Sequence, residues 1–160
     1  MCFGNWLNCL SNVFLQFLKQ TGYCPQFDGL VDIMTGDEML FLYCRLRGLP
    51  EHQIPAHVKD LIKRLGINYR EKMLHLDNIK QFCFLYHPSG LKKHWARRCG
   101  NYSGGNKRKL STAIAMAAEP SILFLDEPTS GVDPVSRRRI WRALTYAINN
   151  GQSCVLTSHR

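Results

Sequence analysis

The sequence predicts an α/β fold in which helices pack against a parallel sheet. Two short apolar runs, Ser121–Leu125 and Ser153–Thr157, are bounded by polar and turn-forming residues and are predicted to be strands. The first is expected to be covered on both faces, and the second is also expected to be buried. Between them, Pro134 begins a helical pattern that lasts to about Asn149, and Gly151 follows as a stop signal. The predicted buried stripe of this helix is Ile140, Leu144, Ala147 and Ile148. A strand–helix–strand order of this kind places both strands parallel in one sheet. The length of 160 residues suits one domain or part of one.

The composition is that of a basic globular protein. The apolar share is 45%, and 21 Lys and Arg against 12 Asp and Glu give a formal net charge of +9. This charge favours anionic partners such as nucleotides, nucleic acids or lipid surfaces. The seven cysteines form no CxxC pair, which indicates reduced thiols in an intracellular protein. No apolar run approaches the roughly 20 residues of a membrane span, and no signal-peptide pattern is present.

The first 18 residues are predicted to form an amphipathic helix. Its apolar side chains recur at helical spacing, at Phe3, Leu7, Leu10, Phe14 and Phe17. We expect this stripe to pack against the rest of the protein. The alternative is a helix on a membrane surface, which would carry several basic residues on its polar face. Only Lys19 is close enough to serve there.

The next segment predicts a strand, a loop and two helices. The strand stops at Pro25, which has no amide proton for a central ladder, and Gln26 follows in the loop. A glutamine at a strand end can coordinate a metal or a water, although an ordinary loop residue is the alternative. Thr35 suits the N-cap of a helix that runs to Arg47. A second helix covers about Pro55–Leu65, with its apolar residues on one face.

Residues 78–100 give a less regular pattern. Gln81–Tyr86 is compatible with a strand or a buried helix. A cluster of basic residues follows, with Trp95 inside it: Lys92, Lys93, Arg97 and Arg98. Basic residues beside an aromatic ring can bind nucleic acid. A solvated basic loop is the alternative, and no recognised nucleic-acid motif accompanies the cluster.

Ser103-Gly104-Gly105 is predicted to open a helix that continues through Leu110–Ala118. Glycines allow backbone N–H groups to approach a phosphate closely, and the N-terminus of a helix favours an anion. The same three residues also occur in ordinary turns, so the motif by itself leaves both interpretations open.

Polar residues follow the two predicted strands of the C-terminal half. Asp126 and Glu127 come directly after an apolar run, and His159 lies just beyond Ser153–Thr157. Magnesium is bound by one or two carboxylates together with water and phosphate oxygens, which suits Asp126. Glu127 could act as a general base on an attacking water, and His159 could donate a hydrogen bond to a phosphate. Structural roles are the alternative for each residue taken alone.

Five motifs occur in one order along the chain. They are Tyr23–Asp28 (YCPQFD), Tyr102–Asn106 (YSGGN), Ile122–Pro128 (ILFLDEP), Ser130–Pro134 (SGVDP) and Thr157–His159 (TSH). This set resembles the Q-loop, signature, Walker B, D-loop and H-loop of the nucleotide-binding domain of ATP-binding cassette (ABC) transporters. The asparagine of YSGGN and the KRKLSTAIAM that follows are most similar to the A subfamily, whose members are largely lipid exporters.

The resemblance implies a P-loop NTPase-type parallel sheet core flanked by helices, with a helical subdomain that carries the signature turn. It covers residues 21–160 as a partial ATPase domain, whereas residues 1–20 do not match. Within this partial domain, residues 35–100, approximately, correspond to the helical subdomain with an irregular insert. Residues 101–160 hold the signature, Walker B, D-loop and H-loop motifs.

The resemblance also implies partners. Two cassettes meet head to tail, and each ATP lies between the P-loop of one cassette and the signature turn of the other. The signature residues would contact a nucleotide held by a second cassette: Ser103, Gly104, Gly105 and Asn106. Asp133 would cross the interface between the cassettes. The domain would act with a transmembrane domain at the cytoplasmic face of a membrane and serve a lipid substrate indirectly.

For the chemistry, the resemblance implies that Asp126 holds Mg²⁺ and Glu127 activates the water. Gln26 would contact the metal and the surface that couples to the transmembrane domain, and His159 would contact the γ-phosphate of ATP.

The family's P-loop, GxxxxGK[ST], is absent from the 160 residues, and the fold is therefore expected to be incomplete. We expect weak or no ATPase activity from the chain alone. Two alternatives remain open at this point. One is a non-enzymatic module that pairs with a complete cassette through its signature turn, and the other, less favoured, is a basic cassette protein that binds nucleic acid.

Overall fold

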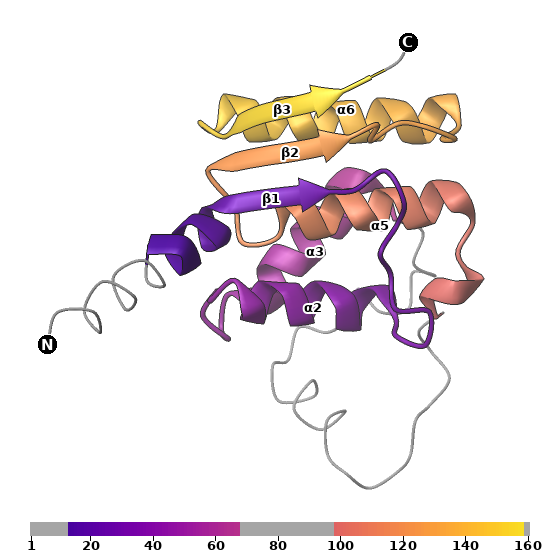
Figure 1. Cartoon of the computed structure of the whole chain (residues 1–160). Helices are drawn as coiled ribbons and strands as arrows, with labels where there is room; N and C mark the ends of the chain where they lie inside the picture. The colour runs from indigo at the N-terminus through magenta and orange to yellow at the C-terminus, as the bar shows by residue number, and fades with distance from the viewer. Residues whose placement is uncertain (1–12, 68–97, 159–160) are drawn as a thin grey trace, which may run out of the picture.

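The structure is a computed structural model of the chain, and it describes residues 13–67 and 98–158. Its three strands form one parallel sheet in the order β1-β2-β3: β1 is Thr21–Cys24, β2 is Ile122–Asp126 and β3 is Ser153–Thr157. The helices are α2 (Gly36–Leu46), α3 (Ile54–Leu65), the 3₁₀ turn η2 (Cys99–Asn101), α5 (Gly104–Met116) and α6 (Pro134–Asn149). The predicted α/β class and the parallel pairing are confirmed (Figure 1).

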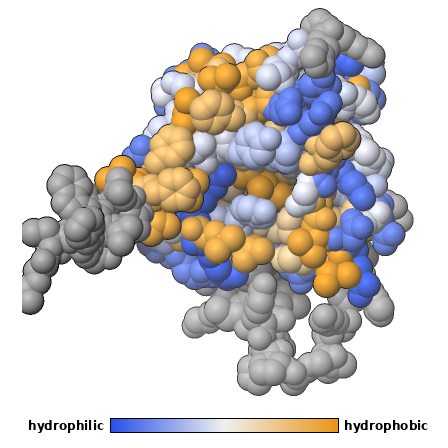
Figure 2. Space-filling view, in the orientation of Figure 1, coloured by the Kyte–Doolittle hydropathy of each residue, from blue (hydrophilic) through white to orange (hydrophobic). Residues whose placement is uncertain are grey.

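One face of the sheet carries the core. Helix α5 packs on β1 and β2 and helix α6 packs on β3, so that Cys24 and Leu123 are fully buried between the sheet and α5. Successive side chains of a strand point to opposite faces of the sheet, and the row Tyr23, Phe124 and Val155 points to the face opposite α5. In the described part of the chain nothing covers that face fully, because Tyr23 is 58% exposed and Val155 is 50% exposed. Figure 2 shows apolar residues grouped on this side of the molecule.

The prediction that β2 is covered on both faces is therefore wrong for the described residues, as is the prediction of a buried β3. Leu123 and Leu125 of β2 are buried, whereas Phe124 is only partly so. Most of β3 is exposed, because β3 pairs with one neighbour and α6 shields only one of its faces. Ile148, predicted for the buried stripe of α6, is also exposed.

Two predicted helices form with the expected ends. Thr35 and Glu38 make a reciprocal capping box at the start of α2, with Glu38 N–H donating to Thr35 Oγ1 at 3.2 Å and Thr35 N–H donating to Glu38 Oε2 at 2.9 Å. Helix α3 ends at Gly66, whose φ of +56° is a left-handed conformation that glycine adopts without strain. Helix α5 ends at Met116, two residues before the predicted end, because Ala118 and Glu119 have positive φ angles.

Residues 13–20 are helical, as predicted, but their apolar side chains do not pack in the described structure. Phe14 is 60% exposed and Phe17 is 54% exposed, and Figure 1 shows this helix extending away from the sheet. The packing role expected for Phe14 and Phe17 is therefore wrong here. Phe3, Leu7, Leu10 and the segment 78–97 lie outside the described residues. No helix in the described ranges has the length and apolar character that crossing a membrane requires.

Candidate functional site

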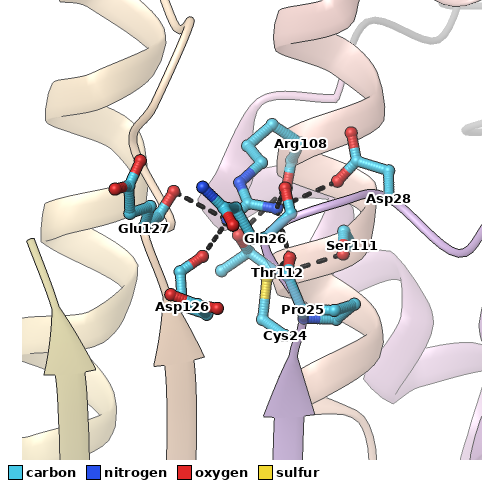
Figure 3. Close-up of polar contacts among 9 residues, drawn as sticks. All are labelled: Cys24, Pro25, Gln26, Asp28, Arg108, Ser111, Thr112, Asp126 and Glu127. Atoms are coloured by element: carbon cyan, nitrogen blue, oxygen red, sulfur yellow. Dashed lines mark hydrogen bonds and ion pairs between the residues drawn. The ribbon is translucent and has the colours of Figure 1, made fainter.

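The carboxyl ends of the three parallel strands lie at one edge of the sheet, and four candidate residues lie at or just beyond these ends. Asp126 is the last residue of β2 and pairs in register with Thr157, the last residue of β3. Glu127 continues from β2, and Gln26 lies two residues beyond the end of β1. We refer to Gln26, Asp126, Glu127 and Thr157 as the strand-end cluster. The edge at which these residues lie is the ligand-binding edge of open α/β sheets. Figure 3 shows Gln26, Asp126 and Glu127 at this edge.

The hydroxyl of Thr157 connects both acidic residues. It donates to Asp126 Oδ1 at 2.5 Å and accepts from the backbone N–H of Glu127 at 3.2 Å. One carboxylate oxygen of Asp126 is thereby held in a fixed direction. Thr157 belongs to the TSH motif, but the motif indicates no contact for it, since the hydrogen bond depends on the pairing of β2 with β3.

Glu127 has a backbone φ of +44°, which is rare for a residue with a side chain. A left-handed non-glycine residue costs on the order of 1–3 kcal/mol and persists only where its surroundings hold it. Here Thr157 accepts its N–H, and its carbonyl accepts from Ser130 N–H at 3.1 Å and from Arg108 Nη2 at 2.7 Å. Strain of this kind is concentrated at functional sites, which makes Glu127 a candidate functional residue on structural grounds as well.

Arg108 of α5 is buried, with 4% of its surface exposed, and its guanidinium contacts the loop after β1. Nη1 donates to the carbonyl oxygens of Pro25 at 2.5 Å and Gln26 at 3.1 Å, and to Asp28 Oδ1 at 3.2 Å. The carboxylate of Asp28 supplies the counter-charge that a buried arginine requires.

The second terminal nitrogen of Arg108 contacts the end of β2. Nη2 donates to the carbonyl oxygens of Asp126 and Glu127. One guanidinium therefore joins the loop after β1 to the end of β2 (Figure 3). In the sequence, Arg108 stands out only as part of the KRKLSTAIAM segment after the signature motif. The missed signal is its spacing, because Arg108 lies four residues before buried Thr112 and seven before buried Ala115 on one helix face.

Cys24 lies beneath this network, and its Sγ is 3.5 Å from Ser111 Oγ. Burial raises the pKa of the Cys24 thiol above its ordinary value, outweighing the hydrogen bond from Ser111, which lowers it. The thiol is therefore protonated at neutral pH and is not a nucleophile.

Ser103, Gly104, Gly105 and Asn106 form a second cluster, which we call the signature turn. Ser103 is the N-cap of α5, and its Oγ accepts from Asn106 N–H at 3.4 Å. Ser103 and Gly104 are exposed, and a side chain at Gly104 would meet nothing within 4 Å. The helix N-terminus is thus open toward solvent, as a contact to a ligand outside this chain requires.

The signature turn borders a shallow cavity of about 280 Å³, lined by Ser103, Gly105, Asn106, Lys109, Asp133, Val135, Ser136 and Arg139. Two positively charged side chains, Lys109 and Arg139, line one wall of this cavity. Lys109 Nζ donates to the carbonyl of Gly66 at 2.9 Å, and Arg139 Nη1 donates to the same oxygen at 3.2 Å. Burial, and then the charge of Arg139, lower the pKa of Lys109. The cavity is therefore polar and positively charged along one wall.

Asp133 caps the start of α6 beside this cavity. Its Oδ2 accepts from Val135 N–H at 3.1 Å and Ser136 N–H at 2.9 Å. The hydrogen bonds from Ser136, foremost that from its backbone N–H, lower the pKa of Asp133, so that it is ionised at neutral pH. Asp133 thus lies next to the signature turn of its own chain. His159, the remaining candidate residue, lies outside the described residues.

Comparison with known proteins decides the family. A family model described as ABC transporter matches residues 11–130. This chain belongs to the ABC transporter family. The resemblance to this family inferred from the five motifs is confirmed, and similar proteins include members of the A subfamily. The phospholipid-transporting ATPase ABCA3 of Rattus norvegicus is 43% identical over 141 residues, which is 88% of this chain and 7% of that protein. The ATP-binding cassette sub-family A member 7 of Mus musculus is 42% identical over 141 residues, 88% of this chain and 5% of that protein.

The chain therefore spans less than a tenth of the length of these curated relatives. Solved structures of ABC cassettes share its fold. A structure titled as the ATP binding subunit of an ABC transporter aligns with a TM-score of 0.69 at 20% identity, covering 94% of this chain and 52% of that chain. The dimeric structure of MJ0796, a bacterial ABC transporter cassette, aligns with a TM-score of 0.69 at 16% identity, covering 94% and 56%. The P-loop NTPase-type fold is thereby established for this ABC family member.

Proposed function

We propose that the chain is a portion of the ATP-binding and ATP-hydrolysing domain of a lipid-exporting ABC transporter. The observation that carries the proposal is the convergence of Gln26, Asp126 and Glu127 at one sheet edge, held there by Arg108 and Thr157. The subfamily of the relatives, some of which are named phospholipid-transporting ATPases, supports the choice of a lipid.

The strand-end cluster fits a magnesium ion together with ATP. Its oxygen donors are those that Mg²⁺ prefers, and Mg²⁺ needs only one or two carboxylates when phosphate oxygens and water complete its shell. No group of three or more His, Cys, Asp or Glu residues that could hold a metal exists in the described ranges. Asp126 and Gln26 would hold the ion, which would neutralise charge developing on the phosphates.

Glu127 is proposed as the general base. Its carboxylate would accept a proton from the water that attacks the γ-phosphate, an effect usually worth roughly 10²–10⁴-fold in rate. The backbone of Glu127 is held through its N–H by Thr157 and through its carbonyl oxygen by Arg108, which fixes the point from which its side chain extends. His159 is proposed to contact the γ-phosphate from the end of β3.

The signature turn is proposed to serve an ATP bound to a second cassette in a head-to-tail pair. Ser103 would contact the phosphate through its hydroxyl, and Gly104, Gly105 and Asn106 through the helix N-terminus. Asp133 lies beside the signature turn, because its Oδ1 would be 3.5 Å from a Cβ atom placed at Gly105. It would therefore lie in the same interface. The exposure of Ser103 and Gly104 supports a partner on this face.

At the level of the transporter, we propose that residues 21–160 act at the cytoplasmic face of a membrane, with residues of about 35–100 as the helical subdomain. The Gln26 loop would couple hydrolysis to a transmembrane domain. Phe27 next to Gln26 is 83% exposed, which supports a docking role for this loop. Residues 1–20 are assigned to no part of the cassette.

The chain alone is expected to hydrolyse ATP poorly, because it holds no GxxxxGK[ST] loop to grip the triphosphate. The measurement is magnesium-dependent phosphate release by the purified chain, with Glu127→Gln as the matched variant. We expect wild type and Glu127→Gln to be equally slow, well below about 1 s⁻¹. Turnover of about 1 s⁻¹ or more that Glu127→Gln abolishes would show that the chain is a complete ATPase.

The exposed signature turn also favours a second candidate function, a non-enzymatic module that completes the ATP site of another cassette. Both functions are tested with a reporter cassette. This is a complete P-loop-bearing cassette of the family whose own signature serine is changed to arginine, so that pairs of reporter cassettes have no working signature. Magnesium-dependent phosphate release that appears when this chain is added would then depend on the signature turn of this chain.

A further inference from the structure

Arg108 is the first buried residue behind the signature turn. Ser103 and Gly104 are exposed, residues 105–107 are half-buried, and Arg108 is 4% exposed. The side chain of Arg108 leaves α5 on the side of the sheet and ends between the loop after β1 and the end of β2 (Figure 3). The position of α5 at its N-terminal end is therefore tied to the strand-end cluster through one side chain.

Only arginine has the geometry for these contacts. Its planar guanidinium carries several N–H donors in a fixed fork, so that Nη1 and Nη2 can bind two chain segments at once. Nη1 donates to the carbonyl oxygens of Pro25 and Gln26 and to the carboxylate of Asp28. Nη2 donates to the carbonyl oxygens of Asp126 and Glu127. A lysine could keep the ion pair with Asp28, but its single nitrogen could not bridge the two segments.

The loop after β1 depends on this contact. Within the described part of the chain, residues 25–28 take part in one other side-chain hydrogen bond, a long one of 4.0 Å from Cys24 Sγ to the carbonyl oxygen of Pro25. Glu127, in contrast, is also held by Thr157 and Ser130. Arg108 therefore fixes the Gln26 loop and α5 relative to the end of β2.

We propose that Arg108 is a positioning residue, which holds the signature turn and the Gln26 loop in register with Asp126 and Glu127. The proposal rests on the proposed function, because the position of the signature turn matters only if the turn serves a nucleotide. A displacement of the Gln26 loop moves the guanidinium and with it the N-terminal end of α5. The two clusters then act as one unit rather than independently.

The test uses the full chain with the reporter cassette and measures kcat and KM for ATP. Arg108→Ala is expected to lower kcat by about ten- to a hundredfold, because small displacements of catalytic groups have effects of this size. KM should stay within about twofold, since the reporter's own P-loop holds the ATP. Guanidinium ion at low millimolar concentration should restore kcat in Arg108→Ala, because the emptied space keeps the same carbonyl oxygens; methylammonium should not.

Two variants control for folding. Arg108→Lys keeps the charge beside Asp28 and is expected to lower kcat as Arg108→Ala does, with its folded fraction checked by circular dichroism. Arg142→Ala on the exposed face of α6 removes the same charge elsewhere and should leave kcat unchanged. A kcat for Arg108→Lys and Arg108→Ala equal to wild type would overturn the role of Arg108. A loss of kcat that only follows the loss of folded chain, without rescue by guanidinium, would overturn it as well.

The same assay separates this proposal from the proposed function. If wild-type chain does not activate the reporter cassette, and Ser103→Arg makes no difference, the proposed function fails and the role of Arg108 fails with it. If wild-type chain activates the reporter, Ser103→Arg abolishes the activation and Arg108→Ala preserves it, the proposed function stands and the role of Arg108 alone is overturned.

Discussion

Ser103→Arg is expected to abolish activation of the reporter cassette. Ser103 caps α5 and lies exposed at its N-terminus, where a phosphate would approach. An arginine there removes the capping hydroxyl, adds bulk, and places a positive charge against the positive end of the helix dipole. We expect ATP-dependent association to weaken by about a hundredfold, or roughly 2.8 kcal/mol, when measured by titration of phosphate release.

Two matched variants make the Ser103 result specific. Ser103→Thr keeps a hydroxyl at the N-cap and should retain most of the activation. Thr145→Arg adds the same side chain on the exposed face of α6 and should be neutral. Equal activation by wild type and Ser103→Arg, both folded, would show that the signature turn of this chain serves no nucleotide.

Gly22→Ala is expected to be the most destabilising small substitution in the sheet. A Cβ at Gly22 would overlap the carbonyl oxygen of Ala115, and would lie 2.6 Å from Leu123 Cδ2 and 3.0 Å from Pro120 Cγ. The oxygen belongs to the backbone of α5 and cannot rotate away, so α5 must shift from β1. We expect a loss of about 3 kcal/mol, the upper end for overpacking, from a total stability on the order of 5–15 kcal/mol.

Urea unfolding followed by circular dichroism measures this loss. Gly29→Ala is the matched control, because a Cβ at Gly29 would meet nothing within 4 Å. We expect Gly29→Ala to change the free energy of unfolding by less than about 0.5 kcal/mol. Equal midpoints for the Gly22 and Gly29 variants would contradict the close approach of α5 to β1.

Helix ends were predictable from the sequence because they depend on residues that are close in the chain. Thr35 and Glu38 form a capping box within four residues, and Pro134 starts α6 where the pattern predicts it. The early end of α5 at Met116 could not be foreseen. Ala118 and Glu119 adopt left-handed backbone conformations without a glycine to indicate them, and Ala118 N–H donates to His57 Nε2 of α3 at 3.0 Å.

Burial of the strands was predicted less well, because an apolar run does not reveal which of its faces another element covers. Phe124 and Val155 are as apolar as Leu123, yet they lie on the face that no described helix packs against. The same reason applies to Phe14 and Phe17, whose helical spacing is correct while the expected partner surface is missing from the described structure.

The strand-end residues were predictable because parallel strands bring their carboxyl ends together, and Gln26, Asp126 and Glu127 each follow a predicted strand. The residues that hold them were not. Thr157 contacts Asp126 across 31 positions of the chain, and Arg108 contacts Pro25 across 83. Such contacts depend on strand register and on how α5 packs, which a local pattern does not encode.

The central claim is that the signature turn lies against the γ-phosphate of an ATP held by a second cassette. Vanadate tests it most directly, because orthovanadate trapped with Mg²⁺ and ADP occupies the γ-phosphate position and cleaves nearby backbone under ultraviolet light. With the full chain and the reporter cassette, we expect cleavage of this chain within residues 103–106, absent in Ser103→Arg. Cleavage of the reporter alone at its P-loop, with this chain intact, would contradict the claim.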